Sequence, residues 1–217
     1  MVRLVIFDID GTLIDSESLY IKSAIENCKR NNYNISLDTI MSTIGRDVRS
    51  IREIVSRAGG KDFDYDKYLE NLRKIRSEIV KKEPIELKKG ALNILNFCKE
   101  NNLELAFATS TFKYKQEVIL KDLNILSYFD FCVYGDEIEN SKPAPDIYLK
   151  VLEHFDHKKD EVIIFEDSIN GILSANNAGV RVVCVPDRVK IPEDIKNLAY
   201  KTINDLDKGI DIIKELL

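Results

Sequence analysis

Five short runs of apolar residues, separated by helical patterns, constrain the fold of this chain more than any other feature of its sequence. Each run is almost continuously hydrophobic, which is typical of parallel strands covered on both faces. The runs are Leu4–Phe7, Leu103–Ala108, Phe131–Tyr134, Val162–Phe165 and Val180–Val185. Helical patterns lie between the later runs, at about 88–101, 113–123, 145–155 and 168–178. This alternation predicts an α/β fold built on a doubly wound parallel sheet.

The interval between the first two runs is too long for one strand–helix–strand unit. It spans about 95 residues, whereas about 30 suffice for such a unit. The excess has apolar residues at helical spacing, with a break at Gly59-Gly60, in the stretches 16–30, 37–44, 47–58 and 64–81. We therefore expect residues 15–83 to form an inserted helical cap domain. Residues 1–14 and 84–217 then form a discontinuous core domain.

Composition excludes several classes of protein. The chain has 217 residues and a net charge of -5, without the basic excess of proteins that bind nucleic acid or anionic membranes. No apolar run approaches the roughly 20 residues that span a bilayer, and no signal peptide is apparent. The four cysteines are widely spaced, which favours free thiols in a reducing compartment. We expect a cytoplasmic monomer with no nucleic-acid or membrane partner.

Two aspartates follow the first predicted strand directly. Asp8 and Asp10 are two residues apart, so in an extended chain their side chains point the same way. Two such carboxylates repel unless a cation or a proton lies between them, and Gly11 allows the backbone to turn sharply there. Solvated aspartates at a strand end are the simple alternative. A calcium loop is the other, but the EF-hand pattern places its glycine sixth and the glycine here is fourth.

Three further polar motifs occur at or near the predicted strand ends. Thr109 and Ser110 offer a hydroxyl and amides to a phosphate, Lys142 stands in a stiff proline-rich segment, and Glu166 and Asp167 add two acids. Each motif has an ordinary alternative, namely a helix cap or a solvated charge. The carboxyl ends of parallel strands meet at one edge of the sheet, where ligands bind in open α/β folds. Together the motifs therefore predict a phosphoryl-transfer site that uses Mg²⁺.

The same motifs identify a resemblance. In order, they are similar to the four motifs of the haloacid dehalogenase superfamily of phosphohydrolases, over essentially the whole chain. The matching segments are Asp8-Ile9-Asp10-Gly11-Thr12, the strand end at Thr109, Lys142-Pro143-Ala144-Pro145-Asp146 and Glu166-Asp167-Ser168. The insertion resembles the helical cap of the branch that contains β-phosphoglucomutase and phosphoglycolate phosphatase, and the core is then Rossmann-like.

The resemblance implies a role for each motif. Asp8 would be the nucleophile that forms an aspartyl-phosphate, and Asp10 would be the general acid and then the general base. Mg²⁺ would be held by Asp8, the backbone carbonyl of Asp10 and Asp167, with Glu166 near or in the coordination shell. The phosphoryl group would be held by Thr109, the Ser110 amide and Lys142.

Three other activities remain open at this stage. Dehalogenases of the family need neither a second aspartate nor a metal, and Asp10, Glu166 and Asp167 argue against that activity. A sugar-phosphate mutase of the β-phosphoglucomutase type has a histidine where this chain has Tyr20, which disfavours mutase activity. A non-enzymatic metal-binding module would be expected to have lost Asp8 or Asp10, and neither is lost.

The cap is the predicted source of substrate selectivity. Gly45 matches a glycine loop that reaches the active site in the resembled branch, so Arg46 and Arg49 are candidate contacts to the distal part of a substrate. Tyr20 is a further candidate for the pocket. Solvated arginines and a tyrosine packed in the cap core are the alternatives. The expected substrate is a small phosphorylated metabolite, such as a sugar phosphate or a phosphoglycolate-like acid.

Overall fold

The structure is a computed structural model that describes residues 1–46 and 48–217. The chain forms two compact units, one of residues 1–14 and 86–217, which we call the core, and one of residues 15–85, which we call the helical unit. The second boundary lies two residues beyond the predicted one. Within the core, Ile14 forms an isolated antiparallel bridge with Leu87, and the Lys88 amide donates to the Leu13 carbonyl at 2.8 Å.

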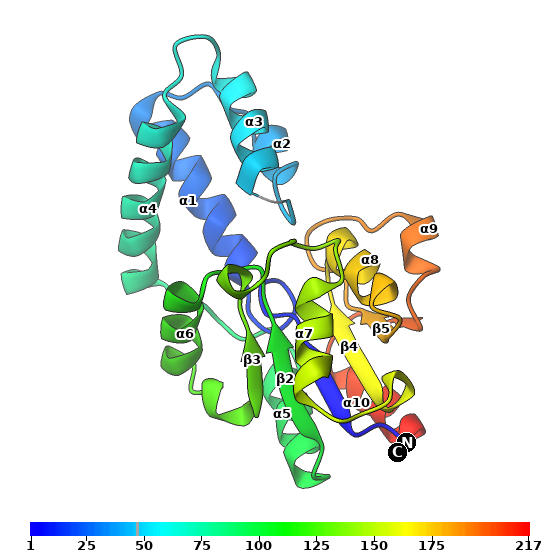
Figure 1. Ribbon diagram of the computed structural model, residues 1–217. Coiled ribbons are helices and arrows are strands. Elements are labelled where there is room, and N and C mark those ends of the chain that lie inside the picture. The colour runs from blue at the N-terminus through cyan, green and yellow to red at the C-terminus, as the bar shows by residue number, and fades with distance from the viewer. Residues whose placement is uncertain (47) are drawn as a thin grey trace. The chain divides into compact units, whose positions relative to one another are not determined.

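In the described part of the chain, six strands form one parallel sheet in the order β3-β2-β1-β4-β5-β6 (Figure 1). The strands are β1 (Leu4–Phe7), β2 (Glu104–Ala108), β3 (Phe131–Val133), β4 (Val162–Glu166), β5 (Arg181–Cys184) and β6 (Lys201–Thr202). The strand order reverses at β1, which pairs with β2 on one side and with β4 on the other. This is the topological switch point at which open α/β sheets bind ligands. The prediction of a doubly wound parallel sheet is confirmed.

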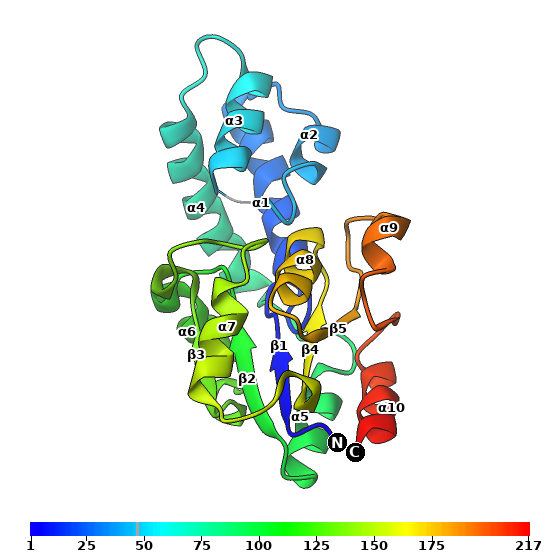
Figure 2. The same cartoon turned by 45° about the vertical axis from the view of Figure 1, so that its right-hand side comes forward.

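Helices cover both faces of the sheet, which explains why the strands are apolar throughout (Figure 2). The core helices are α5 (Ala91–Glu100), α6 (Lys113–Asp122), α7 (Asp146–His154), α8 (Ile169–Asn177), α9 (Glu193–Lys196) and α10 (Asp207–Leu216). Short 3₁₀ turns occupy Leu126–Tyr128, Gly135–Glu137 and Lys159–Glu161. The helix α10 and the polar strand β6 were not predicted, although the isoleucines of α10 have helical spacing.

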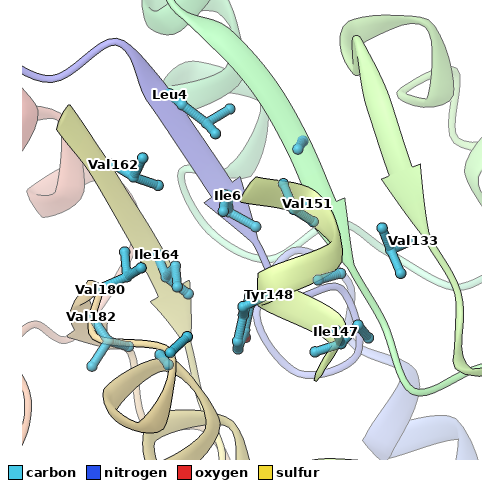
Figure 3. Packing of buried hydrophobic residues seen from close by; sticks show 14 of the residues in the cluster. Leu4, Ile6, Val133, Ile147, Tyr148, Val151, Val162, Ile164, Val180 and Val182 are labelled. Atoms are coloured by element: carbon cyan, nitrogen blue, oxygen red, sulfur yellow. The ribbon is translucent and has the colours of Figure 1, made fainter. Parts of the chain in front are cut away.

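One face of the sheet packs against α7 and α8. Alternate strand residues such as Leu4, Ile6 and Ile164 point into this layer, together with Tyr148 and Val151 from α7 (Figure 3). The opposite face meets α5 and α10, where a Cβ on Gly209 would lie 2.7 Å from the ring of Phe165. Phe7 and Phe165 stack on that face with ring centroids 5.2 Å apart. The two buried layers hold the strand ends rigidly in register.

The helical unit has a core of its own. Its helices are α1 (Ser16–Asn31), α2 (Leu37–Met41), α3 (Val48–Gly59) and α4 (Tyr65–Lys82). Asp15 caps α1 through the Ser18 amide, and Asp64 caps α4 through the Lys67 amide. A cluster of aromatic rings fills the interior, formed by Tyr33, Phe63, Tyr65 and Tyr68. These helices match the predicted stretches, except that Asp47, the predicted first residue of the third, lies outside the described residues.

Among the described residues, no helix has the length and apolar content needed to cross a membrane.

Candidate active site

Strand register brings the predicted motifs to one edge of the core. Phe7 is level with Phe107 on β2 and with Phe165 on β4, so the next residues of all three strands emerge together. The Asp8 amide continues this ladder by donating to the Phe165 carbonyl at 2.9 Å. The acids at the carboxyl ends of β1 and β4, although more than 150 residues apart in sequence, are therefore neighbours, as the parallel pattern predicts.

Lys142 links the two acidic strand ends. Its ammonium donates to Asp8 Oδ1 at 2.6 Å, to Glu166 Oε1 at 2.5 Å and to the Ala108 carbonyl at 3.1 Å. The lysine side chain is only 5% exposed. Burial alone would lower the pKa of Lys142, but the carboxylates of Asp8 and Glu166 outweigh it and hold that pKa well above its usual value. The ammonium is therefore a fixed positive charge beside the predicted nucleophile.

Glu166 is fully buried and has a donor at every position that its carboxylate offers. Oε1 accepts from Lys142 and, at 2.8 Å, from the hydroxyl of Tyr148. Oε2 accepts from the amides of Asp167 and Ser168 and from the Ser168 hydroxyl, at 3.1 to 3.2 Å. A carboxylate has about four lone-pair sites. Five donors surround the Glu166 carboxylate, so both of its oxygens are already saturated with hydrogen bonds.

Two glycines allow the backbone to pack closely against the acidic side chains at this edge of the sheet. Gly171 lies at the start of α8, where a Cβ would come within 1.8 Å of the Glu166 carboxylate. Gly11 has φ +91°, and a Cβ there would lie 2.2 Å from Oδ2 of Asp167. The Thr12 hydroxyl, fully buried, donates to the other oxygen of Asp167 at 3.0 Å. The sharp turn after β1 is thus packed directly against the second acidic motif.

The acids at this edge fit a divalent cation. Ligand atoms of Asp8, Glu166 and Asp167 lie within 4.8 Å of one another, and all three residues are buried. The ammonium of Lys142 contacts two of these three carboxylates, those of Asp8 and Glu166. Burial raises the pKa of Asp8, and Glu166 adds to the rise while Lys142 opposes it. A bound cation would restore the ionised form, and hard oxygen ligands of this kind suit Mg²⁺.

Asp10 has different neighbours from Asp8. Its Oδ2 accepts hydrogen bonds from two hydroxyls of the segment after β2, that of Thr109 at 3.2 Å and that of Thr111 at 2.8 Å. The predicted acid–base group and the predicted phosphate-binding threonine are therefore in direct contact. Ser110, between the two threonines, is exposed.

The candidate specificity residues lie in the helical unit. The Tyr20 hydroxyl shares a hydrogen bond of 2.8 Å with that of Thr43, and burial raises the pKa of Tyr20. Gly45 has φ +69°, and Arg46 donates from Nε to the Ser42 carbonyl at 2.7 Å. Arg46 and Arg49 are exposed. Their role toward a substrate stays a prediction.

Three residues of the site were not singled out from the sequence. Thr12 lies within a predicted motif and Thr111 lies two residues after Thr109, so their place in the sequence made them candidates, but both are in turns whose side-chain directions no strand pattern gives. Tyr148 gave no such signal, because a tyrosine on the apolar face of a helix is usually a core residue. In the structure its hydroxyl reaches the site and donates to Glu166.

The comparisons with known proteins agree with this geometry. The sequence matches the haloacid dehalogenase-like hydrolase family over residues 5–185, and the chain belongs to that family. It is 33% identical to a phosphorylated carbohydrates phosphatase of Thermotoga maritima, over 81% of each chain. It is 28% identical to a phosphoglycolate phosphatase of Aquifex aeolicus, over 96% of this chain and 97% of the relative.

Among solved structures, a Thermotoga maritima protein assigned as a β-phosphoglucomutase superposes with a TM-score of 0.84 at 27% identity. The alignment covers 99% of this chain and 100% of that one. The likeness therefore includes the inserted helices as well as the sheet. The predicted family resemblance is confirmed.

Proposed function

We propose that this chain is a magnesium-dependent phosphatase that hydrolyses a small phosphorylated metabolite through an aspartyl-phosphate on Asp8. The observation that carries the proposal is the buried cluster in which Lys142 bridges Asp8 and Glu166 beside Asp167. The chain is a phosphoric monoester hydrolase by family, and the relatives named above are phosphatases. The metal, the intermediate and the residue roles are our inference.

In the proposed reaction, a carboxylate oxygen of Asp8 forms a bond to phosphorus while the bond from phosphorus to the ester oxygen breaks. Asp10 gives a proton to the departing oxygen. Water then attacks phosphorus of the aspartyl-phosphate, Asp10 takes a proton from that water, and the bond from phosphorus to Asp8 breaks, so that phosphate leaves and both aspartates return to their starting state. Thr109, the Ser110 amide and Lys142 would hold the phosphoryl oxygens.

Asp8 and Asp167, with the backbone carbonyl of Asp10, would hold the magnesium ion. The ion would offset the repulsion between an anionic nucleophile and an anionic substrate. The five donors around Glu166 favour a supporting role, in which this carboxylate fixes Lys142 in place and lies outside the first coordination shell.

The proposed substrates are sugar phosphates and short phospho-acids, the classes named for the two relatives. The deciding experiment is phosphate release from a panel of sugar phosphates, nucleoside monophosphates and phospho-acids, with and without Mg²⁺. We expect Asp8→Asn to abolish release. Asp211→Asn, an exposed aspartate on α10 of the same unit, is the matched control and should retain it. Equal release by wild type and Asp8→Asn would refute the mechanism. No release from any ester would favour a metal-binding module.

A mutase is the second candidate, because of the structural likeness to a protein assigned as a β-phosphoglucomutase. Tyr20 occupies the position of the mutase histidine, and its hydroxyl is bound to Thr43. We therefore expect free phosphate, with no interconversion of glucose 1-phosphate and glucose 6-phosphate in the presence of a bisphosphate. Chromatography of the sugar phosphates would detect an isomer if the mutase alternative were correct.

A further inference from the structure

The segment between β2 and α6 makes a contact that the proposed mechanism does not use. Thr109 and Thr111 both donate to the same oxygen, Oδ2 of Asp10, from 99 and 101 residues away in sequence. Of the two bonds, that from Thr111 is shorter, at 2.8 Å against 3.2 Å. A carboxyl group bound twice through one oxygen is held in a defined plane.

The backbone around Thr111 is itself fixed. The Thr111 amide donates to the Thr109 hydroxyl at 3.0 Å, and the Thr111 carbonyl accepts from the Gly135 amide at 3.2 Å. Gly135 packs so closely that a Cβ would lie 2.1 Å from the Ser110 carbonyl oxygen. Thr111 is therefore presented to Asp10 by a rigid turn that is supported from the end of β3.

The two hydroxyls cannot serve the same purpose once phosphate binds. A hydroxyl has a single proton to donate, so Thr109 must leave Asp10 in order to donate to a phosphoryl oxygen. The hydroxyl of Thr111 can keep its bond to Asp10 during that exchange.

We propose that Thr111 is the positioning residue for the acid–base group Asp10. By holding Oδ2 it sets the place of Oδ1, from which the proton passes to the departing oxygen as the phosphorus–oxygen bond breaks. In the second step Oδ1 takes a proton from the attacking water. This inference rests on the proposed function, because it assumes that Asp10 transfers a proton.

The test compares two esters of nearly the same shape, phenyl phosphate and 4-nitrophenyl phosphate. Phenolate is the more basic leaving group and depends more on a proton from the enzyme. Thr111→Val removes the hydroxyl and keeps the shape. We expect it to lower kcat/KM for phenyl phosphate about 10-fold and for 4-nitrophenyl phosphate less than about 3-fold, a fraction of what a general acid contributes. Thr111→Ser keeps the hydroxyl and should restore both values.

Two results would overturn the inference. An equal loss on the two esters would assign Thr111 to phosphate binding or to the fold. A failure of Thr111→Ser to restore activity would show that the hydroxyl is not the group that matters. Thermal unfolding of each variant shows whether Thr111→Val is folded, and the serine variant keeps the test valid if it is not.

A second measurement uses Asp10→Asn, which has no proton to give. Adding Thr111→Val to that variant should cause no further loss that depends on the leaving group, because the two residues act as one unit. An additive loss on phenyl phosphate would contradict the inference. A wild-type protein inactive on both aryl esters and on the metabolite panel would overturn the proposed function together with this inference. An active wild type with an inactive Asp8→Asn supports the proposed function, and the Thr111 variants then test the role of Thr111 by itself.

Discussion

Lys142 in the core and Lys74 in the helical unit each lie against a glutamate, at 2.5 and 2.6 Å respectively. The side chain of Lys142 is 5% exposed and that of its partner Glu166 is fully buried, whereas Lys74 and Glu70 are 65% and 64% exposed. A buried ion pair incurs a large desolvation cost, and a solvated one contributes little in either direction. The contrast is in line with the proposed function, in which the buried charges of the core take part in the chemistry.

In the helical unit, charged side chains pair at the surface and aromatic side chains fill the interior. Its ion pairs, such as Arg30 with Glu26 and Arg52 with Asp66, lie at the surface. Its interior holds aromatic rings, packed edge to face between Tyr33, Phe63 and Tyr68. Apolar and aromatic burial stabilises this unit, and a network of buried charges forms the edge of the core sheet. Matched substitutions in the two units test whether buried charges carry a cost that solvated charges do not.

The largest effect is expected from the two lysines. Lys142→Met leaves Asp8 and Glu166 buried without their shared cation, so we expect a loss of about 3–5 kcal/mol in the free energy of unfolding. Phosphate release should also be lost. Lys74→Met should leave the urea midpoint unchanged, because its partner is solvated. Equal urea midpoints for Lys142→Met and Lys74→Met would show that the buried ion pair contributes no more to stability than the solvated one.

Two glycines with nearly the same positive φ give the next test. Gly11 and Gly60 have φ of +91° and +89°, but a Cβ on Gly11 meets Asp167 whereas a Cβ on Gly60 meets nothing within 4 Å. Gly60→Ala should cost roughly 1–2 kcal/mol for the left-handed conformation alone. Gly11→Ala should cost a further 1–3 kcal/mol or so for overpacking, and it should weaken magnesium binding. Calorimetric titration and denaturant unfolding measure the two effects.

Magnesium should stabilise the core selectively. At a free concentration 100 times its Kd, the ion should raise the free energy of unfolding by about 2.7 kcal/mol. Hydrogen exchange should slow at β1 and β4, where Asp8 and Asp167 originate. No comparable acidic group occurs in the described part of the helical unit, so local opening there should not change. Asp167→Asn should remove the effect, and its persistence would place the ion elsewhere.

The smallest effect is expected from two buried tyrosines. The Tyr148 hydroxyl donates to Glu166, whereas the Tyr68 hydroxyl has no hydrogen-bond partner among the described residues. Tyr148→Phe should therefore cost about 2 kcal/mol, as for a bond to a charged acceptor, and Tyr68→Phe should be neutral or slightly stabilising. Chemical denaturation of both variants gives the comparison. A costly Tyr68→Phe would indicate that its hydroxyl is bound in solution.

Much of the fold could be predicted from the sequence because local patterns report burial. Near-continuous apolar runs indicated β1 to β5 within one or two residues, since a strand covered on both faces has no solvated side to mark with polar residues. The length of the first interval indicated the inserted helices. The edge strand β6 has only Lys201 and Thr202, and two polar residues carry no such pattern.

The convergence of the acids and Thr109 could also be predicted, because parallel strands bring their carboxyl ends to one edge whatever the details of packing. Lys142 lies in the loop before α7 rather than at a strand end, so its place beside the acids depended on the path of that loop. The partners of each group could not be predicted. That Tyr148 donates to Glu166, and that Thr111 donates to Asp10, depends on rotamers and on contacts between segments 18 and 101 residues apart. Such contacts exist only after the sheet and its helices have packed, so tertiary structure alone decides them.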